Sequence, residues 1–218
     1  GTLTLSGANT YQGNTTVNAG TLVIDGTHTG GAQYTVNAGG TLAGSGSFDA
    51  LVEVNGVISP GNSPGTMSTG TQTWNDGGSY LWEINDSAGS QGADPGWDWL
   101  DITGALDLTS LTAGGFTIDI DSLTLGNVAG NAAGFTGLAF DGYPDVDASF
   151  TIATAGSISG FDASLFSLDD SGFVNGGYWE VREDANSLIL DFYAVPEPSS
   201  TALLGLGGLA LALRRRRS

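Results

Sequence analysis

The chain has 218 residues, of which 36 are glycine and none is cysteine, and only 13% of its residues are charged. The formal net charge is −18, and residues 1–194 carry 22 acidic side chains against one basic side chain, Arg182. So acidic a surface repels phosphate groups, which excludes nucleic acid as a partner, and the lack of cysteine excludes disulfides and thiolate metal sites.

Three similar segments occupy the first third of the chain. They are TTVNAGTLVIDG (15–26), YTVNAGGTLAGSG (34–46) and VEVNGVISPG (52–61), with Val17, Val36 and Val54 at equivalent positions. The resulting period of 18 or 19 residues is too short for a pair of helices, but it fits one coil of two or three short strands. We therefore predict a β-solenoid, in which each coil buries its apolar face by stacking on the next.

Each repeat alternates apolar and polar residues, which places every second side chain on the inside of its coil. The residues predicted to stack into an apolar column are Val17, Leu22, Ile24, Val36, Leu42, Val52, Val54 and Ile58. Asparagines follow the three equivalent valines, at Asn18, Asn37 and Asn55, and glycines close the turns at Gly20, Gly39 and Gly56. Stacked amides favour a hydrogen-bonded ladder, and a ligand-binding row is the alternative.

The segment SPGNSPGTMSTG (59–70) holds two Pro-Gly pairs around Asn62 and Ser63. A phosphate-binding loop would need a lysine and a following helix, so we interpret the segment as a corner of the solenoid. The stretch GTLTLSGANTYQGNTTVNAGTL (1–22) resembles the autotransporter-associated β-strand repeat, and the two later repeats resemble the coils that follow it in passenger proteins. This resemblance, across residues 1–70, implies a right-handed parallel β-helix.

Residues 71–193 keep a strand-like alternation, broken by segments rich in Gly, Asp and Asn. We expect the solenoid to continue here with wider insertions and to end in a looser, sandwich-like β cap. The five tryptophans are interpreted as core or cap residues: Trp74, Trp82, Trp97, Trp99 and Trp179. The alternative is a sugar-stacking platform, for which Trp97 and Trp99 would share one strand face.

Candidate catalytic groups are few. His28 is the only histidine, it lies in a THTGG segment that we interpret as a solvent-facing loop, and the chain has no lysine. A nucleophilic triad and a zinc site therefore lack the residues that they need. Paired carboxylates leave a glycan-active β-helix enzyme as an alternative, but Arg182 alone is a poor counterpart for an anionic polysaccharide. We expect no enzymatic activity.

Clustered acids leave calcium as a candidate ligand. The segment DGYPDVD (141–147) brings Asp141, Asp145 and Asp147 together, and DID (119–121) pairs two more acids. Neither segment matches an EF-hand loop or a calcium-binding nonapeptide repeat. Exposed acids that keep a β surface soluble are the other interpretation, and otherwise no cofactor is expected.

The tail has three parts in order. Pro196, Glu197 and Pro198 precede an apolar run at 201–213, and Arg214, Arg215, Arg216 and Arg217 follow it. As a helix the run would span about 20 Å, which is less than the ~30 Å hydrocarbon core. It can insert into a membrane, but the arginines stop it and favour the cytoplasmic side. A permanent tail anchor and a buried or amphipathic helix are the alternatives.

This order of parts in residues 194–218 resembles the PEP-CTERM sorting signal. The resemblance implies transit through the inner membrane, recognition by exosortase, a membrane-embedded cysteine protease, and removal of the helix near the Pro-Glu-Pro motif. It also implies an exopolysaccharide-producing Gram-negative bacterium.

The sequence predicts an exported, acidic surface or matrix protein. It would comprise solenoid repeats at 1–70, a continued solenoid and cap at 71–193, and a sorting tail at 194–218. Because the sequence begins at Gly1 within a strand pattern, we interpret it as a fragment, so that any signal peptide would lie upstream. The expected role is structural or adhesive within an exopolysaccharide layer and its biofilm, and a carbohydrate-binding module is the first alternative.

Overall fold

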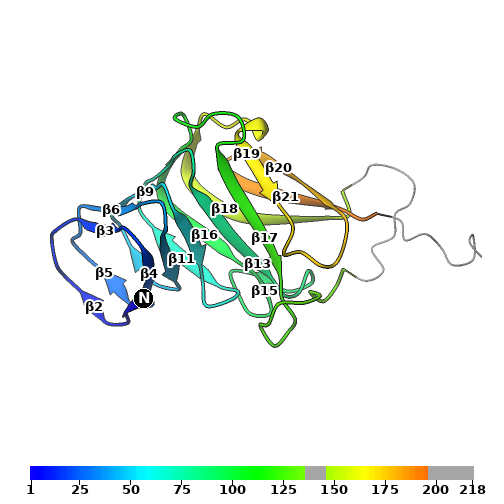
Figure 1. Cartoon of the computed structure of the whole chain (residues 1–218), viewed down its shortest axis with the longest axis horizontal. Helices are drawn as coiled ribbons and strands as arrows, with labels where there is room; N and C mark the ends of the chain where they lie inside the picture. The colour runs from blue at the N-terminus through cyan, green and yellow to red at the C-terminus, as the bar shows by residue number, and fades with distance from the viewer. Residues whose placement is uncertain (136–145, 196–218) are drawn as a thin grey trace, which may run out of the picture.

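Two β-sheets enclose one apolar core in the computed structural model, which describes residues 1–135 and 146–195 (Figure 1). The first sheet contains β1 (Thr2–Leu5), β4 (Gly20–Ile24), β7 (Gly40–Gly44), β10 (Val57–Pro60), β13 (Ser79–Ile84), β14 (Ser90–Gln91), β15 (Gly96–Trp97), β17 (Phe116–Ser122) and β19 (Phe166–Asp169). The second sheet contains β2 (Ala8–Asn9), β3 (Thr15–Val17), β5 (Thr27–His28), β6 (Gln33–Val36), β8 (Ser47–Phe48), β9 (Leu51–Val54), β11 (Thr66–Thr69), β12 (Gln72–Trp74), β16 (Trp99–Asp107), β18 (Ala148–Ser159), β20 (Tyr178–Asp184) and β21 (Ser187–Tyr193). A short 3-10 helix, η1, spans Ala163–Leu165.

Successive coils stack in parallel, as the repeat predicts. The strands β1, β4, β7 and β10 pair in sequence within the first sheet, and β3, β6, β9 and β12 do so in the second. Val17 lies opposite Val36, and Val36 opposite Val54, which confirms the alignment of the three segments. The protein is therefore an all-β molecule with parallel sheets, consistent with a β-solenoid.

The predicted apolar column is confirmed, because all eight of its residues are buried. Strand burial alternates as expected, so that in β9 Val52 and Val54 point inward while Glu53 is partly exposed. The narrow core widens toward the later coils, where Trp74 stacks on Phe116 with ring centroids 4.3 Å apart. Burial of apolar surface at about 25 cal/mol per Å² makes this shared column the main source of stability.

The corners of the coils are set by asparagine and glycine. The Asn37 side-chain amide donates to the Asn18 side-chain oxygen at 2.8 Å, which is the first step of the predicted ladder. The glycine alignment was predicted one residue off: Gly20 lies opposite Gly40 rather than Gly39. A Cβ on Gly40 would lie 2.3 Å from the Val17 carbonyl oxygen, so this position has no room for a side chain.

The coils change shape after the fourth. In that coil β11 and β12 are separate strands, but both pair with the single long strand β16, at Trp99–Ile102 and Leu106–Asp107 respectively. The next coil likewise places the long strand β18 on β16. The boundary expected at residue 70 falls between β11 and β12, within one coil.

Antiparallel strands close the far end of the molecule, where β21 pairs with both β18 and β20. Aromatic rings fill the space beneath these strands. The ring centroid of Trp179 lies 5.6 Å from that of Trp82 and 5.7 Å from that of Phe150. We call β18, β20 and β21 the cap. It covers the last coils with bulky side chains, as the sequence predicted for this end.

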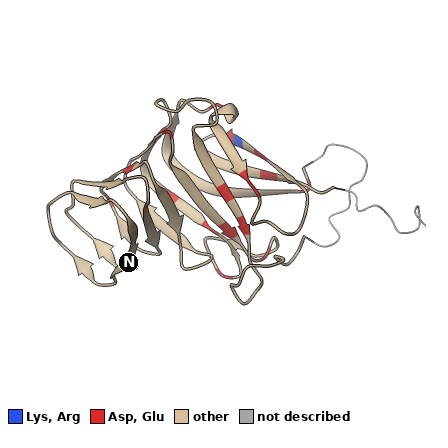
Figure 2. Ribbon diagram, viewed as in Figure 1, with Lys and Arg blue, Asp and Glu red and all other residues tan. Residues whose placement is uncertain are grey.

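Charge is unevenly distributed along the molecule. Residues 1–24 contain no charged side chain, and the first is Asp25. Figure 2 shows acidic residues across the later strands, and Arg182 lies in β20 of the cap.

Candidate functional site

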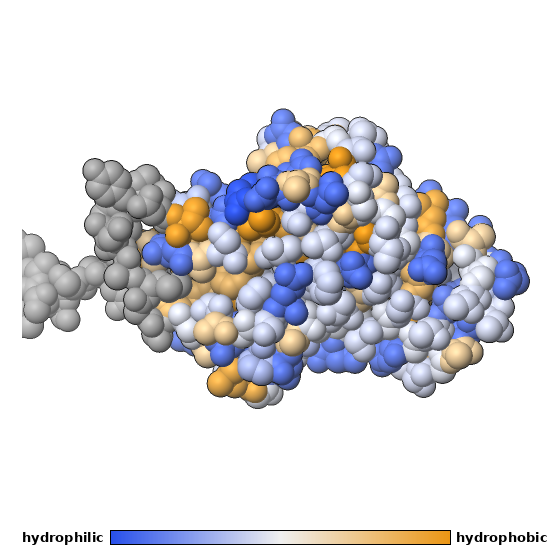
Figure 3. Space-filling view, turned by 180° about the vertical axis from the view of Figure 1, so that it is seen from behind, coloured by the Kyte–Doolittle hydropathy of each residue, from blue (hydrophilic) through white to orange (hydrophobic). Residues whose placement is uncertain are grey.

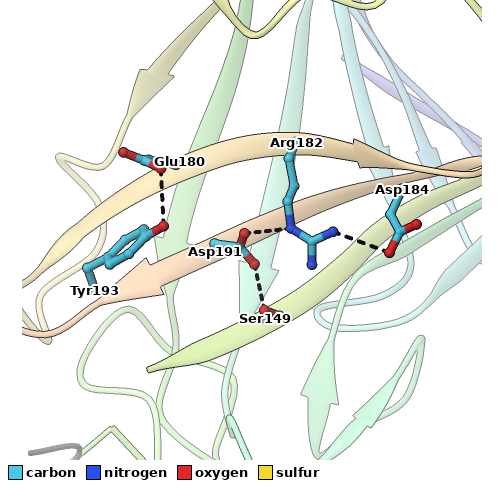
Figure 4. Close-up of polar contacts among 6 residues, drawn as sticks. All are labelled: Ser149, Glu180, Arg182, Asp184, Asp191 and Tyr193. Carbon is cyan, nitrogen blue, oxygen red and sulfur yellow. Dashed lines mark hydrogen bonds and ion pairs between the residues drawn. The ribbon is translucent and has the colours of Figure 1, made fainter. Parts of the chain in front are cut away.

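The outer face of the cap carries a polar network (Figure 4). Alternation along β20 points Tyr178, Glu180, Arg182 and Asp184 away from the core. From β21, Asp191 and Tyr193 share this face, because they lie opposite Glu180 and Tyr178 in register. The cap therefore carries a row of polar and aromatic side chains on its outer face, of which Asp191 is buried.

Arg182 is held by two carboxylates. Its Nε donates to Asp191 Oδ2 at 2.6 Å, and its terminal nitrogen donates to Asp184 Oδ2 at 3.4 Å. Asp191 is only 5% exposed and also accepts from the Ser149 hydroxyl. The hydrogen bond to Asp191 raises the pKa of Arg182 further. The two carboxylates thus offset the guanidinium charge within the cap, which weakens its electrostatic attraction for an anionic ligand.

Tyr178 and Tyr193 form a stacked pair beside this network. Their ring planes are 3° from parallel and their centroids are 4.7 Å apart. The Tyr193 hydroxyl donates to the Glu180 carboxylate at 3.1 Å. Tyr178 is 44% exposed, and sequence reasoning missed it; the alternation in GGYWEVRED could have placed it on the outer face.

The exit of the chain from the cap is fixed by Asp147. Its backbone N–H donates to the Phe192 carbonyl at 2.9 Å, and its carboxylate accepts from the Ala194 N–H at 2.7 Å. Asp147 was a calcium candidate, but its carboxylate holds the backbone that follows β21. The other two candidates, Asp141 and Asp145, lie outside the described residues.

The second acidic pair lies on the outer face of the first sheet. Asp119 is opposite Asp169 on the neighbouring strand, and Asp121 is opposite Glu83. Partial burial and then the neighbouring carboxylates raise the pKa of both Asp119 and Asp121. Within residues 1–135 and 146–195, no group of three or more His, Cys, Asp or Glu is arranged to hold a metal ion.

Trp97 and Trp99 do not share a strand. Trp97 ends β15 in the first sheet, and Trp99 begins β16 in the second, with buried Asp98 between them. Trp97 donates to the Thr151 carbonyl at 3.1 Å and packs edge-on against Phe150. The prediction that they share one strand face was wrong, because they belong to strands of different sheets. Both residues are half-buried, and a glycan contact by either ring stays a prediction.

Asp98 is a buried acid that sequence reasoning overlooked. Its two carboxylate oxygens accept from the backbone N–H groups of Gly65 at 2.7 Å and Glu83 at 3.0 Å. Burial, and then the charge of Glu83, raises the pKa of Asp98 well above its ordinary value. The sequence signal was an acid on the inward phase of GWDWL. These two hydrogen bonds join a turn to a strand. Because Asp98 has no exposed surface, it cannot reach a substrate.

His28 was expected to face solvent, and this was wrong. The ring is 2% exposed, its Nδ1 is hydrogen-bonded to the Tyr34 hydroxyl at 2.5 Å, and its Nε2 to the Tyr11 carbonyl at 2.8 Å. It also stacks on the Tyr11 ring. The residue was misjudged because THTGG resembles a loop, whereas His28 ends β5 and faces into the coil.

The three parts of the predicted sorting tail lie outside the described residues: Pro196–Pro198, the apolar run at 201–213, and Arg214–Arg217. In the part of the chain that the structure describes, no helix is long and apolar enough to cross a membrane.

Two family models match the ends of the chain. Residues 194–217 match the model described as the PEP-CTERM protein-sorting motif. The recognition of a PEP-CTERM tail is confirmed. Residues 1–24 match the passenger-associated-transport-repeat model, which confirms the recognition of the first coil. No curated protein matches the chain. The PEP-CTERM match begins at Ala194, directly where the Asp147 carboxylate holds the backbone.

Proposed function

We propose that this chain is an exported, non-enzymatic β-solenoid protein that exosortase processes at its tail. Its role after processing is structural or adhesive, within an exopolysaccharide-rich layer at or outside the cell surface. The observation that carries the proposal is the PEP-CTERM match at residues 194–217, which follows the last strand of the cap without an intervening domain.

The chemistry of the tail supports a transient membrane stage. The run at 201–213 is apolar but short, so insertion is favourable and anchoring is weak. Moving one arginine to the middle of a bilayer costs about 2.5–3.5 kcal/mol, and four follow the run. We infer that Arg214–Arg217 stay cytoplasmic while the folded domain lies on the opposite side, where a membrane protease meets the Pro-Glu-Pro motif.

The folded domain supports a passive role. Its lone histidine is buried in hydrogen bonds, its most buried acid is bonded to backbone N–H groups, and the Arg182 charge is offset by carboxylates. A stack of coils with a right-handed winding, which stays a prediction, would give an extended scaffold. No cofactor is proposed for this role, and an acidic surface keeps such a scaffold soluble.

The proposal is tested by substituting the motif. The triple variant Pro196→Ala, Glu197→Ala, Pro198→Ala is expressed as the full chain in a host that contains an exosortase. We expect the unaltered chain to reach the cell surface and the variant to remain in the inner-membrane fraction, because the protease no longer recognises its site. Fractionation and immunoblotting measure both.

The matched control is Ser199→Ala, Ser200→Ala, which changes the adjacent residues and should behave as the unaltered chain. Surface delivery of the triple variant at the normal level would contradict the proposal. Retention of the unaltered chain in the membrane would also contradict it, and would favour the permanent tail anchor.

A further inference from the structure

The folded cap and the processing motif are separated by almost no free chain. The backbone is held as far as Ala194 by the Asp147 carboxylate, and Pro196 follows after one residue, Val195. From Val195 to Pro198 a chain reaches at most about 10 Å, and from Val195 to Thr201 about 20 Å. A protease that binds the motif, and a membrane that holds the apolar run, must both come close to this end of the cap.

The end of the cap presents an apolar surface at that place. Tyr178 and Tyr193 stack on one another on the outer face, and Val195 follows Tyr193 by two residues. Tyr178 is 44% exposed and Val195 57% exposed. Figure 3 shows hydrophobic residues on the surface at this end of the molecule. We call Tyr178, Tyr193 and Val195 the exit patch.

We propose that the exit patch is a docking surface for the exosortase, so that the enzyme recognises the folded cap together with the Pro-Glu-Pro motif. This inference rests on the proposed function, because it names a second contact with the same partner. Tyrosines are enriched in the cores of protein interfaces, since they bury large area at a small cost in conformational entropy. The short connection makes the contact nearly intramolecular once the motif is bound.

Charge favours a protein partner over a lipid surface. Peripheral attachment to anionic lipid needs free lysines or arginines, and residues 1–194 contain only Arg182. That guanidinium is paired with Asp191 and Asp184, Glu180 accepts from the Tyr193 hydroxyl, and Asp147 accepts from the N–H of the next residue, Ala194. A lipid headgroup layer would therefore gain little from the patch, whereas an apolar protein surface would bury it.

The inference is tested by the rate of tail removal. The full chain and its Tyr178→Ser variant are expressed in a host with an exosortase, and processing is followed by pulse-chase. We expect the variant to be processed about tenfold more slowly, the loss typical of one aromatic anchor in an interface. Tyr178→Phe should be processed at the normal rate, because the ring and not the hydroxyl makes the contact.

The matched control is Leu3→Ser, which removes an exposed apolar side chain from the first coil, at the other end of the molecule. It should leave the rate unchanged. A further variant inserts twelve Gly and Ser residues between Val195 and Pro196. We expect the insertion to slow processing, and the Tyr178→Ser substitution to cause a smaller additional loss in its presence, because the longer flexible linker lowers the effective concentration of the exit patch at the enzyme.

Equal rates for Tyr178→Ser and Leu3→Ser, with normal processing of the unaltered chain, would overturn the inference and leave the proposed function intact. Faster processing after the insertion would also overturn it, since the cap would then obstruct the enzyme. In a host without the protease, a lower membrane-bound fraction of Tyr178→Ser would assign the patch to lipid instead. Failure to process the unaltered chain would instead count against the proposed function.

Discussion

At the scale of single residues, the acids of this protein fall into two groups. Asp98, Glu83, Asp119 and Asp121 are wholly or partly buried, and burial raises the pKa of each. Acids on exposed turns behave oppositely: hydrogen bonds from Asn127 and Asn85 lower the pKa of Asp94. Protonation of the first group stabilises the folded state, whereas ionisation of the second group stabilises it.

These opposite shifts predict the pH dependence of stability. At a pH above the ordinary aspartate pKa of 3.8, a group with a raised pKa binds more protons in the folded state than in the unfolded chain. Stability therefore decreases as the pH rises from 3.8 through the folded pKa. We expect the melting temperature to increase as the pH is lowered from 7 to about 4.5, and to decrease below about 3.8, because the unfolded chain then binds protons that folded groups with a lowered pKa, such as Asp94, do not.

Asp98 is expected to contribute most to that increase, because it is the most deeply buried of the four. Thermal unfolding followed by circular dichroism from pH 3 to 8 measures the effect. In Asp98→Asn the increase between pH 7 and 4.5 should be smaller, whereas Asp49→Asn, at an exposed acid between β8 and β9, serves as a control. A melting temperature that rises with pH over this window would contradict the account.

At the scale of elements, the repeat and its inward residues were predictable, because one period and one alternation determine both. The sequence predicted glycines at the turns, but it did not show why these positions must be glycine. Gly20, Gly40 and Gly56 each approach a backbone carbonyl of the preceding coil, so that an added Cβ would lie 2.3–2.4 Å from its oxygen. Coil spacing is set by the strand ladders, and only the structure shows where that spacing leaves no room.

This contact predicts the effect of Gly56→Ala. The added Cβ would lie 2.3 Å from the Asn37 carbonyl oxygen, and a backbone atom cannot move aside cheaply. We expect the free energy of unfolding to fall by about 1–3 kcal/mol, the usual cost of overpacking. Denaturant unfolding measures the change.

Gly7→Ala is the matched control, since a Cβ there meets nothing within 4 Å. Its effect should stay within about 1 kcal/mol in either direction. Equal losses for the two variants would contradict the account of the corners.

Other elements were less predictable. The pairing of both β11 and β12 with the single long strand β16 joins segments about 30 residues apart, which no local pattern encodes. The same holds for His28, whose partners Tyr11 and Tyr34 come from the coil corner before it and the strand after it. Trp97 and Trp99 fit one alternation, but the chain passes from one sheet to the other between them.

At the scale of the whole molecule, the chain divides its tasks between two parts. Residues 1–135 and 146–195 build a stacked, acidic β scaffold closed by the cap, and the match at 194–217 supplies the sorting motif. The motif was recognisable in the sequence because its three parts are contiguous. The exit patch was not, since Tyr178 and Tyr193 meet only through the pairing of β20 with β21.

The most direct test of the central claim is the mass of the C-terminal peptide. The protein is recovered from otherwise identical cells with and without the exosortase, digested, and its C-terminal peptide identified by mass spectrometry. We predict that with the protease the chain ends near Pro196–Pro198, and that without it the chain ends in Arg214–Arg217 and Ser218. An intact arginine-rich end in both strains would show that the tail is a permanent anchor and not a sorting signal.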